Sequence, residues 1–526
     1  MIAGSAGEWY RLLRDFNPIG PCRKDVFPGF SMAPNVVSAV PTPAMNRMND
    51  QSPPTNIPLC VDLDGTLIKT DLLWESLLYL IKKQPFVLLL LPLWLLRGRA
   101  ALKHEIAARV RLDPKHLPYN QPFVDFLRQE RHSGRELLLA TASHVTFARD
   151  VAGHLGLFDD RVLGSDEAVN LKGHVKAKVL VERYGSRRFD YAGDSTADLA
   201  VWAEAHQAIV VNGSPRLVRQ VEATTGVARV FDRSRNWLRI LVRTLRSHQW
   251  AKNVLVFVPL IASHQVGDVS RVLSALLTFV SFSLCASSVY IVNDCLDLES
   301  DRQHPRKRTR PFASGDLSIS WGLLLAAGSL VASFWIAALV GQPFLLVLAV
   351  YLVLTTGYSF YLKQFVLVDV ILLAQLYTVR VYGGGAATGI VPSHWLLTFS
   401  LFIFLSLALM KRFTELRLME HADKKILHGR GYWVTDLEHI ASIGSASGLL
   451  AVLVLALYIS SKEVLVLYSH PEMLWLVCPV MLYWISRAWM LAYRDRMEDD
   501  PVVFAVRDPK SYMMAGIIGV ILFLAK

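Results

Sequence analysis

The sequence holds few cysteines, and they form no recognisable ligand pattern. The five are Cys22, Cys60, Cys285, Cys295 and Cys478. No two of them form a CxxC pair, and none stands at zinc-ligand spacing from a histidine. The spacing argues against both a structural zinc site and a disulfide framework, so we expect reduced, structural cysteines.

The amino-terminal region lacks the apolar core of a secretory signal. Such a signal needs an apolar run of about 7 to 15 residues, whereas residues 1–54 are rich in Pro, Asn and Ser. We predict a disordered leader over residues 1–54, or an extension upstream of a start at Met45 or Met48.

Charge is also scarce. Charged residues make up 19% of the chain and hydrophobic residues 53%, with a mean hydropathy of +0.34, which excludes an ordinary soluble protein. At 526 residues the chain is also too long for one compact core. Charges mix with short apolar runs over residues 57–235, and apolar stretches of membrane-spanning length recur beyond them. We predict one domain over residues 55–230, a linker over 231–243 and a membrane domain over 244–526.

The charges that are present are unbalanced. The formal net charge is +11, which suits a protein that lies against anionic lipid and holds phosphorylated substrates. We expect no nucleic-acid partner, because the membrane loops described below hold much of this charge.

Carboxylates follow short apolar strands in the first domain. The run over residues 57–67 predicts a buried strand that ends in Asp62 and Asp64. A second strand over 136–140 leads to Thr141, and a third segment places Asp194 and Asp198 just beyond another strand. The ends of parallel strands face one crevice, where ligands bind. The pattern therefore predicts an α/β domain with a carboxylate-lined site.

These residues resemble the motifs of the haloacid dehalogenase superfamily. DxDGT stands at 62–66, Thr141 follows a strand, Lys176 comes next, and GDSxxD stands at 193–198. The resemblance implies a Rossmannoid phosphatase in which Asp62 is the nucleophile and Asp64 the general acid/base. Thr141 and Lys176, with Lys178 as the alternative lysine, would bind the phosphoryl group. The implied Mg²⁺ site contains Asp62, Asp194, Asp198 and the backbone carbonyl of Asp64. A folded but inactive relic is the alternative.

A helical insertion over residues 72–130 is predicted to form a cap over this site. Its apolar run at 82–97 is too short to span a bilayer, is flanked by bases and contains a Trp. Two interpretations stay open: an in-plane contact with the membrane and a buried cap helix. Pro92 argues against one uninterrupted helix in either case.

The second domain contains nine apolar stretches. They run over 252–263, 272–293, 317–341, 343–362, 365–387, 395–410, 437–460, 472–493 and 511–525. Lys and Arg are concentrated in the segments after the second, sixth and eighth stretches. By the positive-inside rule these loops are cytoplasmic, which keeps the first domain in the cytosol and the protein in the inner (cell) membrane as a multi-pass protein.

An acidic motif lies at the carboxy-terminal end of the second apolar stretch. Asn293, Asp297 and Asp301 are spaced four apart, so a helix would present an amide and two carboxylates on one face. Such oxygen ligands suit Mg²⁺, which in turn suits a diphosphate. An acidic helix end that pairs with the bases following it is the alternative.

This motif, NDxxDxxxD, resembles the first signature of the UbiA superfamily of membrane transferases. The resemblance extends over 244–526 and implies an all-α domain of about nine transmembrane helices. Within the superfamily, the sequence most resembles the decaprenyl-phosphate phosphoribosyltransferase subfamily. The supporting blocks are residues 245–254, 301–315, 358–363 and 411–415. The second DxxxD pair of quinone-type enzymes is absent, and YSFYLK stands in its place. Tyr361 departs from the subfamily, which often has lysine there.

The resemblance implies Mg²⁺-dependent transfer of phosphoribose from phosphoribosyl pyrophosphate to a polyprenyl phosphate. Asp297 and Asp301 would act on the departing diphosphate, with Asn293 as the third Mg²⁺ ligand. The remaining predicted substrate-binding residues are Lys252, Asp294, Arg310, Tyr358, Lys363 and Arg380. Alternatives are an internal ion pair of Arg380 with Asp369, and ordinary interfacial lysines at 252 and 363.

Fusion of the two domains suggests sequential action. The first domain would remove the 5-phosphate from the phosphoribosyl lipid made by the second, giving a precursor for pentose donors of cell-wall synthesis. Two rival functions remain: an aromatic prenyltransferase fused to a phosphatase, and a phosphatase with a noncatalytic membrane anchor.

Overall fold

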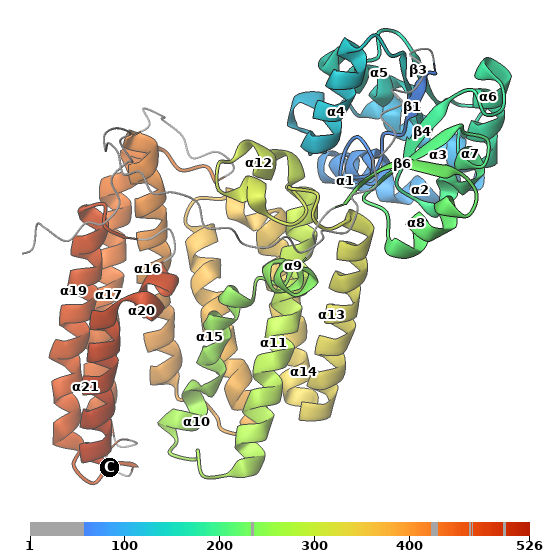
Figure 1. Cartoon of the computed structure of the whole chain (residues 1–526). Coiled ribbons are helices and arrows are strands. Elements are labelled where there is room, and N and C mark those ends of the chain that lie inside the picture. Colours follow the sequence, from blue (N-terminus) through green and yellow to red (C-terminus); the bar gives the residue numbers. More distant parts are fainter. Residues whose placement is uncertain (1–56, 233–235, 422–429, 462–463, 465–466, 498–500) are drawn as a thin grey trace, which may run out of the picture. The chain divides into compact units, whose positions relative to one another are not determined.

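The computed structural model describes residues 57–232, 236–421, 430–461, 464, 467–497 and 501–526 (Figure 1). The predicted leader over residues 1–54 lies outside the described residues, as do residues 233–235 of the predicted linker over 231–243. The amino-terminal part is an α/β domain, and the carboxy-terminal part is helical.

The α/β domain is built on one parallel sheet of six strands in the order β3-β2-β1-β4-β5-β6. The strands are β1 (Leu59–Val61), β2 (Leu137–His144), β3 (Val162–Ser165), β4 (Asp190–Gly193), β5 (Gln207–Val211) and β6 (Gly226–Phe231). The strand order reverses direction between β1 and β4, which is where a sheet of this type binds ligands. The predicted strands are therefore present, although β2 continues through Thr141 where the prediction ended it at residue 140.

Both faces of the sheet are covered, because alternate residues along each strand enter different cores. Leu59 and Val61 of β1 pack with the core that includes Phe123 and Phe147, whereas Cys60 between them packs with the core that includes Trp202. The helices and turns of this domain are α1 (Leu72–Lys83), η1 (Pro85–Leu89), α2 (Leu91–Leu96), α3 (Arg99–Arg109), η2 (Pro114–His116), α4 (Gln121–His132), α5 (Val145–Leu155), α6 (His174–Tyr184), η3 (Thr196–Asp198), α7 (Leu199–Trp202) and α8 (Pro215–Glu222).

The predicted cap region is helical but broken. Its apolar run is divided between α1, η1 and α2, and a proline lies in the first turn of each of the last two elements. The expectation that Pro92 prevents one uninterrupted helix is confirmed, because proline is tolerated in the first turn and not in a helix interior.

The helical domain begins with α9 (Trp237–Thr244) and the short elements η4 (Ser247–Phe257) and α10 (Val258–Ala262). Its longer helices are α11 (Val269–Leu296), α13 (Ile319–Val340), α14 (Gln342–Phe360), α15 (Val368–Thr388), α16 (His394–His421), α17 (Leu437–Ile459), α19 (Val477–Tyr493) and α21 (Pro509–Ala525). Shorter elements between them are α12 (Leu298–Gln303), η5 (Lys307–Thr309), η6 (Leu362–Gln364), η7 (Val434–Asp436), η8 (Pro471–Leu476) and α20 (Pro501–Arg507).

Small and hydroxylated residues bring the helices of this domain close together. Ser281 of α11 and Ser333 of α13 each donate a hydrogen bond to the other's backbone carbonyl, at 2.9 and 2.7 Å. Gly384 of α15 faces the carbonyl of Val256, and a Cβ on Gly384 would lie only 1.9 Å from that oxygen. Close backbone approach through small residues is typical of helix pairs in membranes.

Among the described residues, six helical segments are long and apolar enough to cross a membrane. They are Val269–Leu296, Ile319–Val340, Gln342–Phe360, His394–His421, Val434–Ile459 and Pro471–Tyr493. The nine predicted stretches all fall on helical segments, but three of them are not among these six. α10 has only five residues and α21 only 17, and α15 contains Asp369 and Arg380. The count of nine spans therefore stays a prediction.

Candidate functional site

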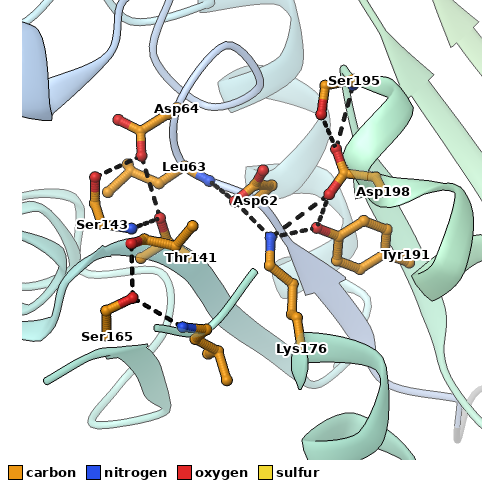
Figure 2. Close-up of polar contacts among 12 residues, drawn as sticks. Asp62, Leu63, Asp64, Thr141, Ser143, Ser165, Lys176, Tyr191, Ser195 and Asp198 are labelled. Atoms are coloured by element: carbon orange, nitrogen blue, oxygen red, sulfur yellow. Dashed lines mark hydrogen bonds and ion pairs between the residues drawn. The ribbon is translucent and has the colours of Figure 1, made fainter. Parts of the chain in front are cut away.

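Asp62 and Lys176 form the centre of a site at the carboxyl end of the sheet. Asp62 follows β1 directly, and Lys176 Nζ lies 3.0 Å from its Oδ1 (Figure 2). The backbone N–H of Leu63 donates to the same oxygen at 2.9 Å. Burial raises the pKa of Asp62 to about 6, although the nearby Lys176 cation acts in the opposite direction. The buried ion pair thus holds a carboxylate oxygen at the strand end beside a fixed positive charge.

Tyr191 and Asp198 hold the lysine from the other side. Lys176 Nζ donates to the Tyr191 hydroxyl at 2.7 Å, and that hydroxyl donates to Asp198 Oδ1 at 2.8 Å (Figure 2). The Ser195 hydroxyl and backbone N–H both donate to the other oxygen of Asp198. Since Lys176, Tyr191 and Asp198 are all buried, this chain of hydrogen bonds fixes the ammonium group rather than leaving it to solvent.

Asp64 faces a different set of groups. Its Oδ2 accepts hydrogen bonds from the hydroxyls of Ser143, at 2.6 Å, and Thr141, at 3.3 Å, both on β2. Its Oδ1 accepts from the backbone N–H of Leu72 at 2.8 Å. Burial raises the pKa of Asp64 to about 7, and the Asp71 carboxylate adds to this effect. A carboxyl group with such a pKa can both give and take a proton near neutrality.

Three carboxylates at this site are close enough to share a metal ion. Oxygens of Asp62, Asp194 and Asp198 all lie within 4.8 Å of one another. Burial raises the pKa of Asp194 well above its usual range, and the neighbouring Asp62 and Asp198 add to the rise. Carboxylate oxygens are the donors that Mg²⁺ prefers, and a divalent cation would offset their mutual repulsion. The residues present therefore fit the predicted cation.

A glycine allows this cluster to form. Gly65 has a φ of +78°, and a Cβ at this position would lie 2.1 Å from Asp194 Oδ2. Both the left-handed backbone and the close carboxylate require glycine here. The Gly of the DxDGT motif thus brings the loop after β1 against the loop after β4.

Lys178, the alternative for the lysine role, lies outside the site. Lys178 is 79% exposed and forms only a 3.9 Å pair with Glu182, one turn further along α6, whereas Lys176 is 2% exposed. Two residues along a helix turn a side chain by about 200°, so only one of the two lysines can enter the site. Sequence reasoning missed Tyr191 and gave no role to Ser143; both lie within a few residues of the motifs.

The acidic motif of the helical domain is bound by arginines. Arg310 Nη1 lies 3.0 Å from Asp294 Oδ1 and 2.7 Å from Asp301 Oδ2. Arg246 forms a second, two-point ion pair with Asp294. Asp294 and Asp301 are both buried, so one guanidinium joins a residue predicted as a metal ligand to one predicted as a substrate contact.

The helix is interrupted at one residue within this motif. α11 ends at Leu296, Asp297 caps it, and α12 begins at Leu298. The backbone N–H of Asp297 still bonds to the carbonyl of Asn293, and that of Asp301 to Asp297, at 2.9 and 2.8 Å. The Asp297 carboxylate is one-third exposed and pairs with Lys82 Nζ at 2.6 Å. The Asp297 backbone departs from helical dihedral angles, with φ −101° and ψ +15°, so the common helical face of Asn293, Asp297 and Asp301 stays a prediction.

The Asn293 amide adopts a different contact. It donates to the Ser359 hydroxyl at 3.0 Å, near the end of α14. This hydrogen bond connects the acidic motif to the YSFYLK segment at 358–363, which contains Tyr358 and Lys363. Lys363 is half-buried in η6, and Lys252 Nζ lies 5.9 Å from the centre of the Tyr377 ring.

Arg380 does not pair with Asp369. Its Nε donates to Asn253 Oδ1 at 2.7 Å, its Nη2 to the Tyr351 hydroxyl at 2.8 Å and its Nη1 to the carbonyl of Leu376. The proposed internal ion pair is thus wrong, because the two residues are eleven positions apart on one helix, or about 16 Å.

The family model named UbiA prenyltransferase family matches residues 254–513. This segment holds the acidic motif and the helices that position it. Residues 254–513 form a UbiA prenyltransferase family domain. Because this UbiA-family domain carries several membrane-spanning helices, the protein is a multi-pass membrane protein.

Two curated relatives illustrate the similarity. The uncharacterized protein y4nM of Sinorhizobium fredii is 38% identical over 88% of this chain and 90% of its own length. The decaprenyl-phosphate phosphoribosyltransferase of Mycolicibacterium smegmatis is 36% identical over 36% of this chain and 62% of its own length. Among solved structures, a UbiA homologue from Archaeoglobus fulgidus bound to GPP and Mg²⁺ is 16% identical, with a TM-score of 0.40 over 54% of this chain and 96% of that chain.

Asp369 instead takes part in a second buried network of the UbiA-family domain. Arg412 of α16 donates from Nε to Asp369 Oδ2 at 2.6 Å, and neither side chain is exposed. The Tyr432 hydroxyl donates to the other oxygen of Asp369, and the Tyr358 hydroxyl accepts from Arg412 Nη2 at 3.3 Å. Sequence reasoning assigned no role to Arg412 or Arg246. The sequence held little signal for Arg412, because it lies among the charged residues that follow the sixth apolar stretch.

Proposed function

We propose that this protein carries out two successive reactions on one lipid. The UbiA-family domain transfers phosphoribose from phosphoribosyl pyrophosphate to a polyprenyl phosphate, and the α/β domain then hydrolyses the 5-phosphate of the product. The transferase proposal is supported by similarity to decaprenyl-phosphate phosphoribosyltransferases. The hydrolase proposal depends on one observation: Asp62, Asp194 and Asp198 converge within 4.8 Å beside the buried Lys176.

In the transfer step, an oxygen of the lipid phosphate attacks C1 of the ribose. The C1–O bond to the diphosphate breaks, and inorganic diphosphate leaves. An anionic phosphate acceptor is already deprotonated, so no strong base is required at this site. The main task of the protein is therefore to bind two anions and to stabilise the departing charge.

The acidic motif suits the departing diphosphate. Mg²⁺, when bound, neutralises developing negative charge on such a leaving group, and Asn293, Asp297 and Asp301 are the residues that we propose hold it, with Asp294 nearby. Arg310 and Arg246 would then turn from the carboxylates to the phosphate oxygens, since guanidinium groups bind both in the same two-point geometry. Lys252, Lys363, Tyr358 and Arg380 remain proposed contacts for the phosphates of the two substrates.

In the hydrolytic step, a carboxylate oxygen of Asp62 attacks phosphorus and the bond from phosphorus to the 5-oxygen of ribose breaks. Protonated Asp64 supplies the proton that this oxygen takes up. Water then attacks the phosphoaspartate, Asp64 accepts the proton of that water, and inorganic phosphate leaves. Lys176 and Thr141 bind the transferring phosphoryl oxygens, and Mg²⁺ offsets their negative charge when bound.

The transfer step is tested with purified full-length protein, phosphoribosyl pyrophosphate and polyprenyl phosphate. Mass spectrometry of the lipid fraction should detect a ribosylated lipid with the wild type and none with Asp297→Ala. Glu299→Ala is the matched control, because Glu299 is an exposed acid of the same motif and should leave the yield unchanged. Equal yields from Asp297→Ala and Glu299→Ala would refute the proposed role. A prenylated phenolic acceptor from added prenyl diphosphate would instead identify an aromatic prenyltransferase.

The hydrolytic step is tested by release of inorganic phosphate from the isolated phosphoribosyl lipid. Lys176→Ala should abolish release, whereas Lys178→Ala should not, since only Lys176 contacts Asp62. Equal release by both variants would exclude the α/β site as the hydrolase.

We further propose that nine helices span the inner (cell) membrane and that the α/β domain, over residues 55–230 with its cap at 72–130, faces the cytoplasm. Support comes from the basic residues that follow the second, sixth and eighth apolar stretches. A cysteine introduced at exposed Val391, which the proposal places outside, should react with an impermeant maleimide in intact cells. One introduced at exposed Val169 should react only after the membrane is opened.

A further inference from the structure

A contiguous apolar segment of the α/β domain is left uncovered. Residues 85–96, formed by η1 and α2, are here termed the apolar segment. Six of its large side chains have more than half of their surface exposed, namely Phe86, Leu88, Leu89, Leu93, Leu95 and Leu96. Single exposed leucines are common on proteins, but a cluster of this kind marks an interaction surface.

Two buried side chains anchor the apolar segment to the α/β domain. Val87 of η1 and Trp94 of α2 are each 5% exposed and join the hydrophobic core of the α/β domain. The Arg109 guanidinium lies 4.8 Å from the centre of the Trp94 ring, which adds a cation–π contact. Val87 and Trp94 therefore point into the domain, while the exposed large apolar side chains of the segment face outward.

The basic residues next to the apolar segment favour an anionic partner. Residues 76–104 contain no Asp or Glu. Lys83, Arg97 and Arg99 lie at its two ends and are exposed, and the Arg97 guanidinium lies 4.0 Å from the Glu105 carboxylate. A surface with an apolar centre and a basic border complements a bilayer with anionic headgroups, which attract each such base.

The short connection between the α/β domain and the first candidate membrane span also favours a bilayer as the partner. The sheet ends at Phe231, and the first membrane-spanning candidate begins at Val269. So short a connection keeps the α/β domain at high local concentration near a bilayer. The segment itself has only twelve residues, fewer than the roughly 20 needed for a helical span, so contact would be in the plane of the interface.

We propose that the apolar segment inserts into the headgroup and upper acyl region of an anionic bilayer, as a second membrane attachment of this protein. Phe86 and the exposed leucines enter the acyl region, and Lys83, Arg97 and Arg99 contact lipid phosphates. Insertion would keep the crevice of the α/β domain at a fixed height above the lipid surface. The proposal does not depend on either proposed activity.

The test is site-directed spin labelling of the full-length protein in nanodiscs containing phosphatidylglycerol. Leu89→Cys carries the label, in a background where serine replaces Cys22 and Cys478; Cys60, Cys285 and Cys295 are buried. Val169→Cys is the control, because Val169 is an exposed apolar residue of the same domain outside the segment. Collisions of the label with lipid-soluble oxygen and with a water-soluble nickel complex are compared. The ratio of oxygen to nickel collisions should be several-fold higher at position 89 than at position 169.

Either of two results would overturn the proposal. Equal ratios at positions 89 and 169 would show that water surrounds the segment. A label at 89 that is immobile and shielded from both reagents would show that protein covers it, either a second copy of the chain or another part of the same one. A second variant tests the charge: Lys83→Gln with Arg97→Gln should lower the ratio at position 89. No change in that variant would refute the contribution of anionic lipid.

Discussion

Lys176 and Tyr191 are joined by a buried hydrogen bond of 2.7 Å from the ammonium group to the phenol oxygen. The phenol hydrogen is directed to Asp198, so the tyrosine holds the lysine beside Asp62. Tyr191 is therefore a positioning residue, one step removed from the proposed chemistry.

Tyr191→Phe should lower the rate of phosphate release roughly ten- to hundredfold, because a hydrogen bond to a charged group contributes about 1.5 to 3 kcal/mol. The loss should fall on kcat more than on KM. Tyr184→Phe is the matched control, since the Tyr184 hydroxyl bonds to Glu136 rather than to a site residue. A full rate for Tyr191→Phe would contradict the positioning role.

Gly65→Ala tests the close approach of the two loops. The added Cβ would lie 2.1 Å from Asp194 Oδ2, so we expect displacement of the carboxylate and loss of phosphate release at ordinary Mg²⁺ concentrations. Gly156→Ala has a similar backbone strain, with φ +65°, but nothing within 4 Å of the added Cβ. It should cost about 1 to 2 kcal/mol of stability and retain activity. Similar rates in the two variants would show that the contact with Asp194 is unimportant.

Asp194→Asn tests the electrostatic cost of the carboxylate cluster. The pKa of Asp194 is raised by folding, so its ionisation destabilises the folded state as the pH rises above the usual carboxylate pKa. At pH 7.5 and without Mg²⁺, the amide should therefore raise the melting temperature of the α/β domain. Mg²⁺ should stabilise the wild type and have little effect on the variant. A lower melting temperature for Asp194→Asn in chelator, measured by differential scanning fluorimetry, would contradict this account.

The buried pair of Asp369 and Arg412 should be essential for the stability of the UbiA-family domain. Asp369→Ala leaves Arg412 buried without its main partner, which costs about 3 to 5 kcal/mol. Arg417→Ala removes a partly exposed pair with Asp495 and should cost less than about 1 kcal/mol. Thermal unfolding in detergent compares them, and equal melting temperatures would contradict the structural role of the buried pair.

The convergence of the carboxylates in the α/β domain could be predicted from the sequence because these residues follow strand ends. Asp62, Thr141 and Asp194 each lie at or next to a strand of one parallel sheet, so local pattern alone brings them together. Tyr191 could not be predicted in the same way, because its role depends on which strand face packs against α6. The choice of Lys176 over Lys178 likewise required the orientation of that helix.

The UbiA-family site was less predictable, because its contacts join distant segments. Helical spacing grouped Asn293, Asp297 and Asp301, but the helix interruption at Asp297 and the ion pairs of Arg310 depend on tertiary packing. Arg380 shows the reverse case: its distance from Asp369 on one helix could have excluded the ion pair from sequence alone.

The most direct test of the two-step account follows two labels through one reaction. Phosphoribosyl pyrophosphate carrying ¹⁴C in the ribose and ³²P in the 5-phosphate is incubated with polyprenyl phosphate, Mg²⁺ and full-length protein, and the lipid is extracted. The wild type should give lipid with ¹⁴C and without ³²P, Asp62→Asn lipid with both labels, and Asp297→Ala lipid with neither. Wild-type lipid that keeps both labels in the starting ratio, or Asp62→Asn lipid identical to wild-type lipid, would contradict the account.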